Sequence, residues 1–352
     1  MRSLSDRQAY IVLIAVLVVV AAVSASVGAY SYSLSQMSRY IAEGLGWIPT
    51  TGGEEIQRNV FLTLRLPRVI LSILTGAVLG LSGAVMQGLF RNPIVEPGLA
   101  GTSAGAAFGA ALVFVFGGTT MAFTSPLGTL AVPIVAFIAS FAATLMVYRV
   151  SSAFGKVNVF TLLLAGVAVN AVCGAGTGFL SYVARDPQAR NITFWNLGTF
   201  TGADWRSVEL VGLFFLLAFM FIRRRAKALN ALMLGEDEAA LLGVDPRRLI
   251  FSLLIANTIM VATATAAVGV IAFVGLVVPH MIRIIRGPGH TFLLTGSALF
   301  GAVLLGAIDI IARVIIPPAE LPIGIITAVV GAPVFLIVLL RDQRRGLPGI
   351  YG

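Results

Sequence analysis

The chain has 352 residues, of which 58% are hydrophobic and only 11% are charged, and its mean hydropathy is +0.97. So few charged side chains cannot cover the surface of a protein of this size in water, which excludes the class of soluble globular domains. The formal charge of +9 does not indicate a nucleic-acid partner, because the basic residues gather at the chain ends and in short connections between apolar segments.

The apolar segments predict about ten membrane-spanning helices, since one helix needs roughly 20 apolar residues to cross a hydrocarbon core of about 30 Å. The segment 276–286 is too short to cross alone and is expected to pack among full-length neighbours. The expected spans are 8–30, 60–89, 96–117, 125–149, 158–183, 205–222, 249–271, 276–286, 292–314 and 321–340. We therefore expect an all-α membrane protein that forms a single transmembrane domain over 1–352.

Positive charge predicts that both ends of the chain lie in the cytoplasm. Arg2 and Arg7 precede the first apolar segment, and Arg341, Arg344 and Arg345 follow the last one. Lys and Arg are enriched in short cytoplasmic loops, and two cytoplasmic ends require an even number of spans. The first segment is too long for the apolar part of a secretory signal, so we expect it to remain as a helix.

The longest predicted outer loop is 31–59, between the first two spans. Its Gly-Gly-Glu-Glu string at 52–55 predicts a polar and partly irregular connection.

Three arginines lie near the outer ends of predicted spans. Arg65 and Arg68 begin the second span, and Arg313 follows Asp309 by one helical turn in the ninth. A charge at the bilayer centre costs on the order of 2.5–3.5 kcal/mol, so these residues are expected at the outer interface. Asp309 can pair with Arg313 at this spacing. Snorkelling explains any one of the three arginines, whereas their clustering indicates an acidic partner or an anionic substrate.

Glycines recur at helical spacing in the second and third spans. Gly76, Gly80 and Gly83 fall on one face, and glycines repeat every fourth residue from Gly101 to Gly109. Small residues at this spacing let helix backbones approach closely in lipid, so the pattern predicts tight helix packing.

One segment, 223–248, is unlike a membrane span and reads RRRAKALNALMLGEDEAALLGVDPRR. Its Glu-Asp-Glu string is typical of the start of a helix, whose N-terminus favours negative charge, and Gly243 can end that helix. The residues between them form an apolar patch. This short helix either docks on a partner or lies as a solvated loop on the membrane, and the pattern alone leaves both open.

The sequence offers no site for catalysis, metal binding or ion coupling. A phosphate-binding loop ends in Gly-Lys-Ser or Gly-Lys-Thr, and neither Lys156 nor Lys227 is followed by Ser or Thr. Asp309 is the only acidic residue that the sequence places deep in a span, which disfavours a transporter driven by an ion gradient. His280 and His290 lack the spacing of metal ligands.

Six strings resemble the permease subunits of type II ATP-binding-cassette (ABC) importers, the group that takes up iron chelates, heme and vitamin B12. They cover nearly the whole chain in the order of that family. The strings are RLPR at 65–68, GAVLGLSGAVMQGLFRNPIVEPGLAGTSAGA at 76–106, LLLAGVA at 162–168, LGEDEAALLGVDPRRL at 234–249, FVGLVVPH at 273–280 and ELPIGIITAVVGAPVF at 320–335.

The resemblance implies a homodimer of ten-helix subunits in the bacterial inner membrane, and this chain would bind no cofactor. Two separate ATPase subunits would bind ATP and Mg, and a periplasmic substrate-binding protein would deliver the cargo. Transport would alternate between outward and inward openings of the permease.

The resemblance also implies roles for residues at matching positions. Arg65, Arg68 and Arg313 would dock the binding protein through its glutamates. The coupling segment, about 229–248, would fit a cleft of the ATPase. Its matching residues are Leu234, Gly235, Glu236, Asp237, Glu238, Ala239, Leu242 and Gly243.

Two further pairs are implied to form a cytoplasmic gate. Asn92 and Ile94 match a constriction between the second and third spans. Val159 and Phe160 stand where some relatives carry small hydroxyl residues in a second constriction, so this gate is expected to differ in shape.

The cargo stays open between heme, a ferric siderophore and cobalamin. The string GTSAGAA and the apolar Val159–Phe160 pair favour heme. The expected function is therefore that of a permease subunit, without an ATPase site of its own, that moves an iron-containing chelate from periplasm to cytoplasm. A secondary transporter that runs on an ion gradient is the alternative of another class.

Overall fold

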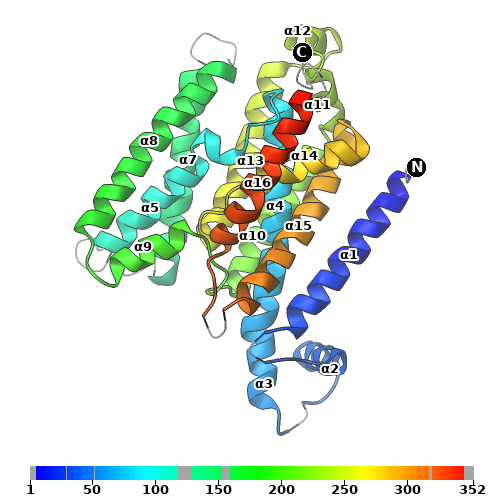
Figure 1. Ribbon diagram of the computed structural model, residues 1–352, viewed down its shortest axis with the longest axis vertical. Helices are drawn as coiled ribbons and strands as arrows, with labels where there is room; N and C mark the ends of the chain where they lie inside the picture. The colour runs from blue at the N-terminus through cyan, green and yellow to red at the C-terminus, as the bar shows by residue number, and fades with distance from the viewer. Residues whose placement is uncertain are drawn as a thin grey trace.

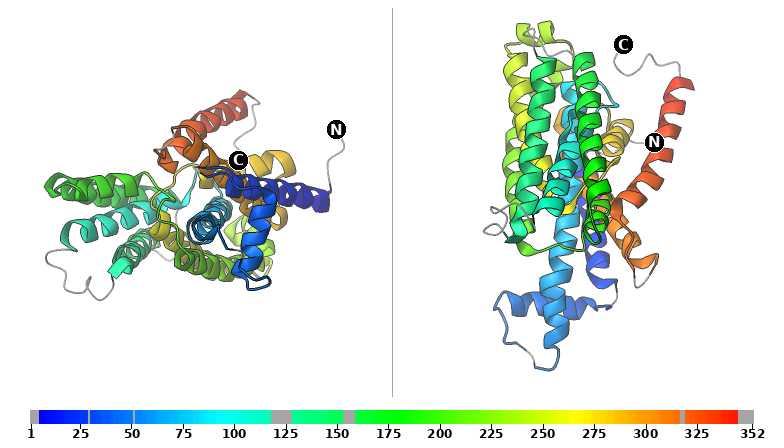
Figure 2. Two further views of the ribbon diagram at one scale, coloured as in Figure 1. Left: turned by 90° about the horizontal axis from the view of Figure 1, so that it is seen from below. Right: turned by 90° about the vertical axis from the view of Figure 1, so that its left-hand side faces the viewer.

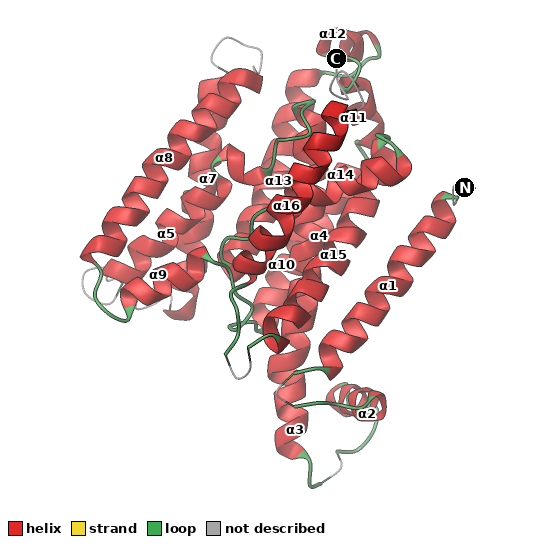
Figure 3. Cartoon of the chain, viewed as in Figure 1, coloured by secondary structure: helices red, strands yellow, loops and turns green. Residues whose placement is uncertain are grey.

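The computed structural model describes residues 5–28, 30–50, 52–117, 128–152, 159–316 and 319–344. The regular structure within these ranges is helical (Figure 3). Its first part comprises α1 (Asp6–Ser26), α2 (Leu34–Gly44), α3 (Glu55–Val60), the π-helix η1 (Phe61–Arg65), α4 (Leu66–Leu89), the 3-10 helix η2 (Pro97–Ala100), α5 (Thr102–Phe116) and the 3-10 helix η3 (Gly128–Leu130). The rest comprises α7 (Ala131–Ser151), α8 (Val159–Val183), α9 (Gln188–Asn196), α10 (Trp205–Arg223), α11 (Ala226–Leu232), α12 (Glu236–Leu241), α13 (Pro246–Val268), α14 (Val274–Arg286), α15 (His290–Val314) and α16 (Ile323–Arg344).

Each of the ten predicted spans corresponds to a helix, and the predicted all-α membrane fold is confirmed. Among the described residues, 7 helices are long and apolar enough to cross a membrane, and one of them is the continuous 35-residue helix made of α3, η1 and α4. Helix α5 is shorter, with 15 residues, and α16 has 22 residues, whose side chains are described without interruption over Ile323–Ile337. The predicted short eighth span is α14, which has 13 residues.

Helix α4 lies at the centre of the larger of two helix groups (Figures 1 and 2). Its neighbours there are α1, α10, α13, α14 and α15. Helices α5, α7, α8 and α9 form the second group, which contacts the first where α7 and α5 pack on α13. The apolar window of the α4 helix is 83% buried, whereas that of α1 is only 11% buried. The exposed apolar face of α1 is therefore suited to lipid.

Close backbone contact explains the glycines of α4. A Cβ at Gly76 would overlap the carbonyl oxygen of Gly301 on α15, and a Cβ at Gly83 would overlap that of Gly275 on α14. The predicted tight packing of this glycine face is confirmed. Gly101 has a different role from the one expected, because its φ of +87° places it in the turn before α5 rather than on the helix face.

The two ends of the bundle are built differently, and we name them the α12 end and the α3 end (Figure 1). Helix α1 begins and α16 ends toward the α12 end. There Arg286, at the last turn of α14, pairs with Asp6 in the first turn of α1. Helices α2 and α3 form the α3 end, where α3 extends beyond the rest of the bundle.

The segment 31–59 is partly irregular, as expected, but the sequence did not predict that it contains α2 and α3. The Gln36 amide donates to Ser33 Oγ at 3.2 Å, and the Ser33 amide donates to Gln36 Oε1 at 2.9 Å. This capping box satisfies two amides that the start of a helix leaves without partners. Tyr40 of α2 is fully buried near Phe61, and that tertiary contact is not visible in the sequence.

Substituting Ala for Gly76 should lower the free energy of unfolding by about 1–3 kcal/mol, because the added methyl group forces α4 and α15 apart. Thermal unfolding in detergent measures the loss. Gly212→Ala in α10 is the matched control, since its Cβ would meet Leu74 Cδ1 at an ordinary 3.6 Å. Equal effects of the two substitutions would show that the α4–α15 contact can adjust freely.

Candidate functional site

At the α3 end, four charged side chains form a cluster, named here the ion cluster: Arg68, Asp309, Arg313 and Glu320. Arg68 Nε and Nη2 donate to Asp309 Oδ1 at 3.0 and 2.9 Å, and its Nη1 donates to the two oxygens of Glu320 at 2.8 and 2.7 Å. Arg313 Nε lies 3.0 Å from Asp309 Oδ2, which confirms the predicted pairing. Asp309 is fully buried, and the two arginines compensate a charge that would be very costly alone.

The arginines also hold the chain that follows α1. Arg313 Nη1 donates to the Val27 carbonyl at 2.8 Å, and its Nη2 donates to the Ser24 carbonyl and hydroxyl oxygens at 3.0 and 2.7 Å. Arg65 donates to the same Val27 carbonyl and to the Tyr30 carbonyl, the latter at 3.2 Å. The three arginines of the predicted docking set thus come together at one end, and each is bonded within the chain.

Burial limits what these arginines can offer to another protein. The side chains of Arg68 and Arg313 are only 11% and 5% exposed. Arg68 approaches the surface on the side of Glu320, which is 35% exposed and also accepts a hydrogen bond from the Thr201 hydroxyl at 3.1 Å. Sequence reasoning missed Glu320, because no spacing rule relates it to an arginine 252 residues away.

At the opposite end, α11 and α12 project beyond the spans (Figure 1). Leu229 and Leu232 of α11 are buried, and α11 contacts α4 and α15. Ala239 is the fully buried anchor of α12. Gly235 and Gly243 bound this helix with φ values of +139° and +80°, which L side chains rarely adopt.

The outer face of α12 is apolar. Leu241 and Leu242 are 89% and 63% exposed, and Leu234, just before the helix, is also exposed. Glu236, Asp237 and Glu238 fill the first turn. An exposed apolar patch with a polar rim marks a contact with a protein or with a membrane. Ala239, part of the predicted coupling set, supports this surface from beneath.

The first predicted gate pair lies in the turn after α4. Asn92 Oδ1 accepts a hydrogen bond from the Ile94 amide at 3.0 Å, which closes an Asx turn. Ile94 is exposed.

The second predicted gate pair lies at the start of α8, toward the α12 end (Figure 1). Phe160 is exposed. Val159 is the first residue of α8, and its side chain lies outside the described part of the chain.

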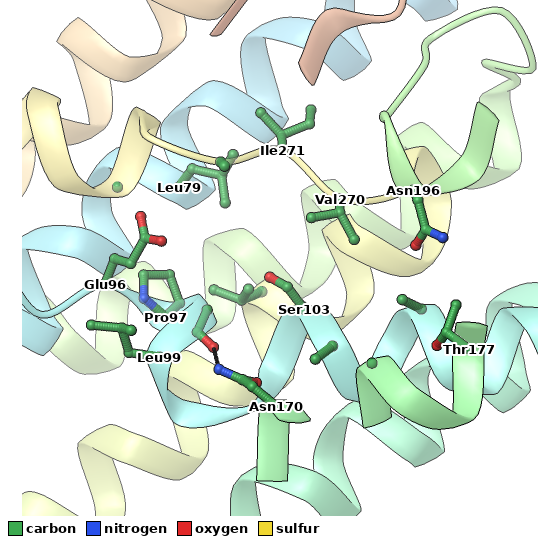
Figure 4. A pocket seen from close by; sticks show the side chains of 17 residues that line it. Leu79, Glu96, Pro97, Leu99, Ser103, Asn170, Thr177, Asn196, Val270 and Ile271 are labelled. Carbon is green, nitrogen blue, oxygen red and sulfur yellow. Dashed lines mark hydrogen bonds between the residues drawn. The ribbon is translucent and has the colours of Figure 1, made fainter. Parts of the chain in front are cut away.

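A cavity of about 490 Å³ lies between the two helix groups (Figure 4). Its walls come from α4, α5, α8 and α13, the end of α9, the connection between α4 and α5, and the chain that leads into the first turn of α14. Most lining residues are apolar. The residues that bring polar side chains to it are Glu96, Ser103, Asn170, Thr177 and Asn196. Asn170 Nδ2 donates to the Gly98 carbonyl at 3.1 Å, so α8 is tied to the α4–α5 connection.

Glu96 is a second acidic residue inside the bundle, which corrects the expectation that Asp309 is the only one. Its carboxyl group accepts a hydrogen bond from the Phe273 amide, directly before the first turn of α14. The expected span began at residue 96, near the membrane surface, and the sequence does not reveal that this connection re-enters the bundle.

Known proteins match this chain over most of its length. The model of the FecCD transport family matches residues 14–341. The hemin transport system permease protein HmuU of Yersinia pestis is 39% identical over 338 residues, which are 95% of this chain and 96% of that protein. The cobalamin import system permease protein BtuC of Halobacterium salinarum is 38% identical over 319 residues, which are 86% and 82% of the two chains.

A solved structure shares this fold. It is described as an inward-facing conformation of an ABC transporter assigned to the metal-chelate type, and it superposes with a TM-score of 0.80 at 30% identity. The match covers 94% of this chain and 98% of the other.

Replacing Arg68 by Met should lower the free energy of unfolding by about 3 kcal/mol or more, because Glu320 then loses its positively charged partner and Asp309 keeps only one. Thermal unfolding in detergent measures this. The control is Arg248→Met, since Arg248 pairs with Asp245 at 89% and 52% exposure and should cost less than about 1 kcal/mol. A loss at Arg68 no larger than the control would mean that the ion cluster contributes nothing to stability.

The Glu320 bridge should make stability sensitive to acid. Burial acts to raise the pKa of this carboxyl, but the hydrogen bonds and charge of Arg68 outweigh it and hold the pKa below its ordinary value of 4.5. The bridge is thus fully present above pH 4.5 and is lost as the pH falls through the lowered pKa. The stability difference between the native chain and Glu320→Gln should stay constant from about pH 8 to about pH 5 and shrink at lower pH. A difference that already shrinks near neutral pH would contradict this assignment.

Proposed function

This chain belongs to the FecCD transport family. We propose that it carries heme across the membrane. It is a multi-pass membrane protein and the permease subunit of an ABC importer, as the names of its relatives and of the similar solved structure indicate. The proposal concerns the cargo, the partners, the orientation and the working residues.

Heme is favoured because the relative named for hemin transport matches over 95% of the chain at 39% identity. The largely apolar cavity, with a few hydroxyl and amide groups, also suits a flat and mostly apolar cargo. Cobalamin is the second candidate, since a relative named for its import reaches 38% identity. A ferric siderophore is the third.

The observation that carries the coupling proposal is the exposed apolar face of α12. In this proposal Leu234, Leu242 and the acidic first turn contact the ATPase, which binds ATP and Mg. Gly235, Ala239 and Gly243 hold α12 in shape, and α11 passes its movement to α4 and α15. The α12 end then lies in the cytoplasm, together with both chain termini.

A second copy of this chain would complete the pathway. Helix α8 exposes an apolar face, which includes Val167, Val172 and Phe179. In a homodimer this face lines the passage next to the cavity. Asn92 and Ile94, with Val159 and Phe160, then narrow its cytoplasmic end.

The α3 end would receive a periplasmic substrate-binding protein. Arg65 and Arg313 shape this surface by fixing the Val27 carbonyl. Arg68 would meet a carboxylate of the partner directly, in exchange for Glu320. ATP binding would then bring the ATPase subunits together, and the permease halves would switch between outward and inward openings.

Leu242→Arg should abolish recovery of the ATPase subunit with this chain. A charge in the centre of a buried contact costs about 2 kcal/mol or more, which is more than about tenfold in affinity. Co-purification after joint expression measures the effect. Arg247 is exposed in the first turn of α13, so Arg247→Gln is the control. Undiminished recovery with Leu242→Arg would refute the coupling role of α12.

The cargo can be tested in proteoliposomes that contain the complete importer, its binding protein and ATP. Uptake of heme should exceed uptake of a ferric siderophore and of cobalamin. Faster cobalamin uptake would overturn the heme proposal and leave the importer class intact. Uptake driven by an imposed ion gradient without ATP would overturn the mechanism itself.

A further inference from the structure

Helix α2 lies across the long axis of the bundle, beside the end of α1 (Figure 2). Its inner face packs on the long central helix through Met37 and Tyr40, which are buried with Phe61. Glu43 on the same face pairs with Arg58 of α3 at 3.2 Å. These contacts hold α2 in a fixed position across the α3 end of the bundle.

The position of Trp205 places α2 at the level where the spans end. Trp205, the first residue of the span α10, donates from its indole nitrogen to the Leu62 carbonyl at 2.9 Å. Leu62 follows Phe61, which α2 covers, so α2 and Trp205 contact the same turn of the central helix. Tryptophan at the start of a span is typical of the membrane interface. The α2 helix therefore lies at that interface.

A second apolar stripe runs along the exposed side of α2. Leu34, Ile41 and Leu45 are all exposed, and their spacing of seven and then four residues keeps them on one helix face. Trp47 follows in the next turn and is 76% exposed. We call these four residues the α2 stripe.

The surroundings of the α2 stripe match a lipid surface. The stripe carries no charge, and α2 lies beside the end of α1, whose exposed Ile and Val side chains are suited to lipid. Ser35, about 100° around the helix from Leu34, is exposed on the polar side of α2, whereas the small exposed Ser38 lies within the stripe, between Leu34 and Ile41. An amphipathic helix in the interfacial plane, with an aromatic residue at its end, has this composition.

We propose that α2 is an interfacial anchor that inserts the α2 stripe into the outer part of the acyl-chain layer at the α3 end. The anchor ties the turn held by Arg65 and Arg313 to the membrane surface. It thereby fixes the height of the ion cluster relative to the lipid. This assignment does not depend on which cargo the chain carries.

Spin labelling of the full-length chain tests the anchor, because Cys173 is the only cysteine and can be replaced by Ala. A nitroxide is placed at Ile41→Cys or, as matched control, at Ser35→Cys on the polar side of the same helix. Both variants are put into phosphatidylcholine nanodiscs. The label at 41 should collide more often with oxygen, which concentrates in lipid, and the label at 35 with a water-soluble nickel chelate.

Preference for the nickel chelate at both positions would overturn the proposal, because the stripe would then face water. Protection of position 41 from both reagents would also overturn it, because a second copy of the chain would then cover the stripe. Intrinsic fluorescence provides a check without a label on α2. In a Trp195→Phe, Trp205→Phe chain, Trp47 should be quenched more by lipid brominated close to the headgroup than by lipid brominated at the chain end, and absence of quenching by either lipid would contradict the anchor.

Discussion

Helices α4 and α15 meet backbone against backbone at Gly76 and Gly301. This contact fixes the distance between the two helices, and the positions of the other helices follow from it. Lipid tails are as apolar as the helices, so burying leucine does not drive association, and close approach must supply the attraction through van der Waals contact. Once α4 is held this closely, its first turn places Arg68 beside Asp309. Its last turn places Gly88 against His290 at the start of α15. The packing of this one helix pair thus positions the Arg68–Asp309 ion pair at one end of the bundle and His290 at the other.

The ion cluster changes the meaning of the outer arginines. As isolated residues they suggest a positively charged surface that waits for an acidic partner. In the structure Arg313 satisfies Asp309 and the end of α1, and only the outer edge of Arg68 is shared with the half-exposed Glu320. Replacing these arginines therefore tests folding and docking together.

Much of the fold could be predicted because lipid imposes a simple rule on length and composition. The spans, the short α14, the glycine face of α4 and the pairing of Asp309 with Arg313 all follow from periodicity or local spacing. The features that were missed depend on contacts between distant segments. Glu320 meets Arg68 across nearly the whole chain, Glu96 meets α14 through a connection that re-enters the bundle, and α2 is ordered by packing on Phe61. For the candidate site, local spacing indicated which residues gather at each end but not which of them are buried.

The short length of α14 has a further consequence. Its 13 residues rise only about 20 Å, against about 30 Å of hydrocarbon, so roughly a third of the thickness at that position is not crossed by helix. The non-helical chain before Val274 and the turn around Glu96 make up the difference, and both line the cavity. Peptide groups outside a helix are tolerated at this depth only where they face protein or water. The cavity wall therefore keeps these peptide groups away from lipid, in part by pairing them within the chain, as the Val270 amide pairs with the Trp195 carbonyl.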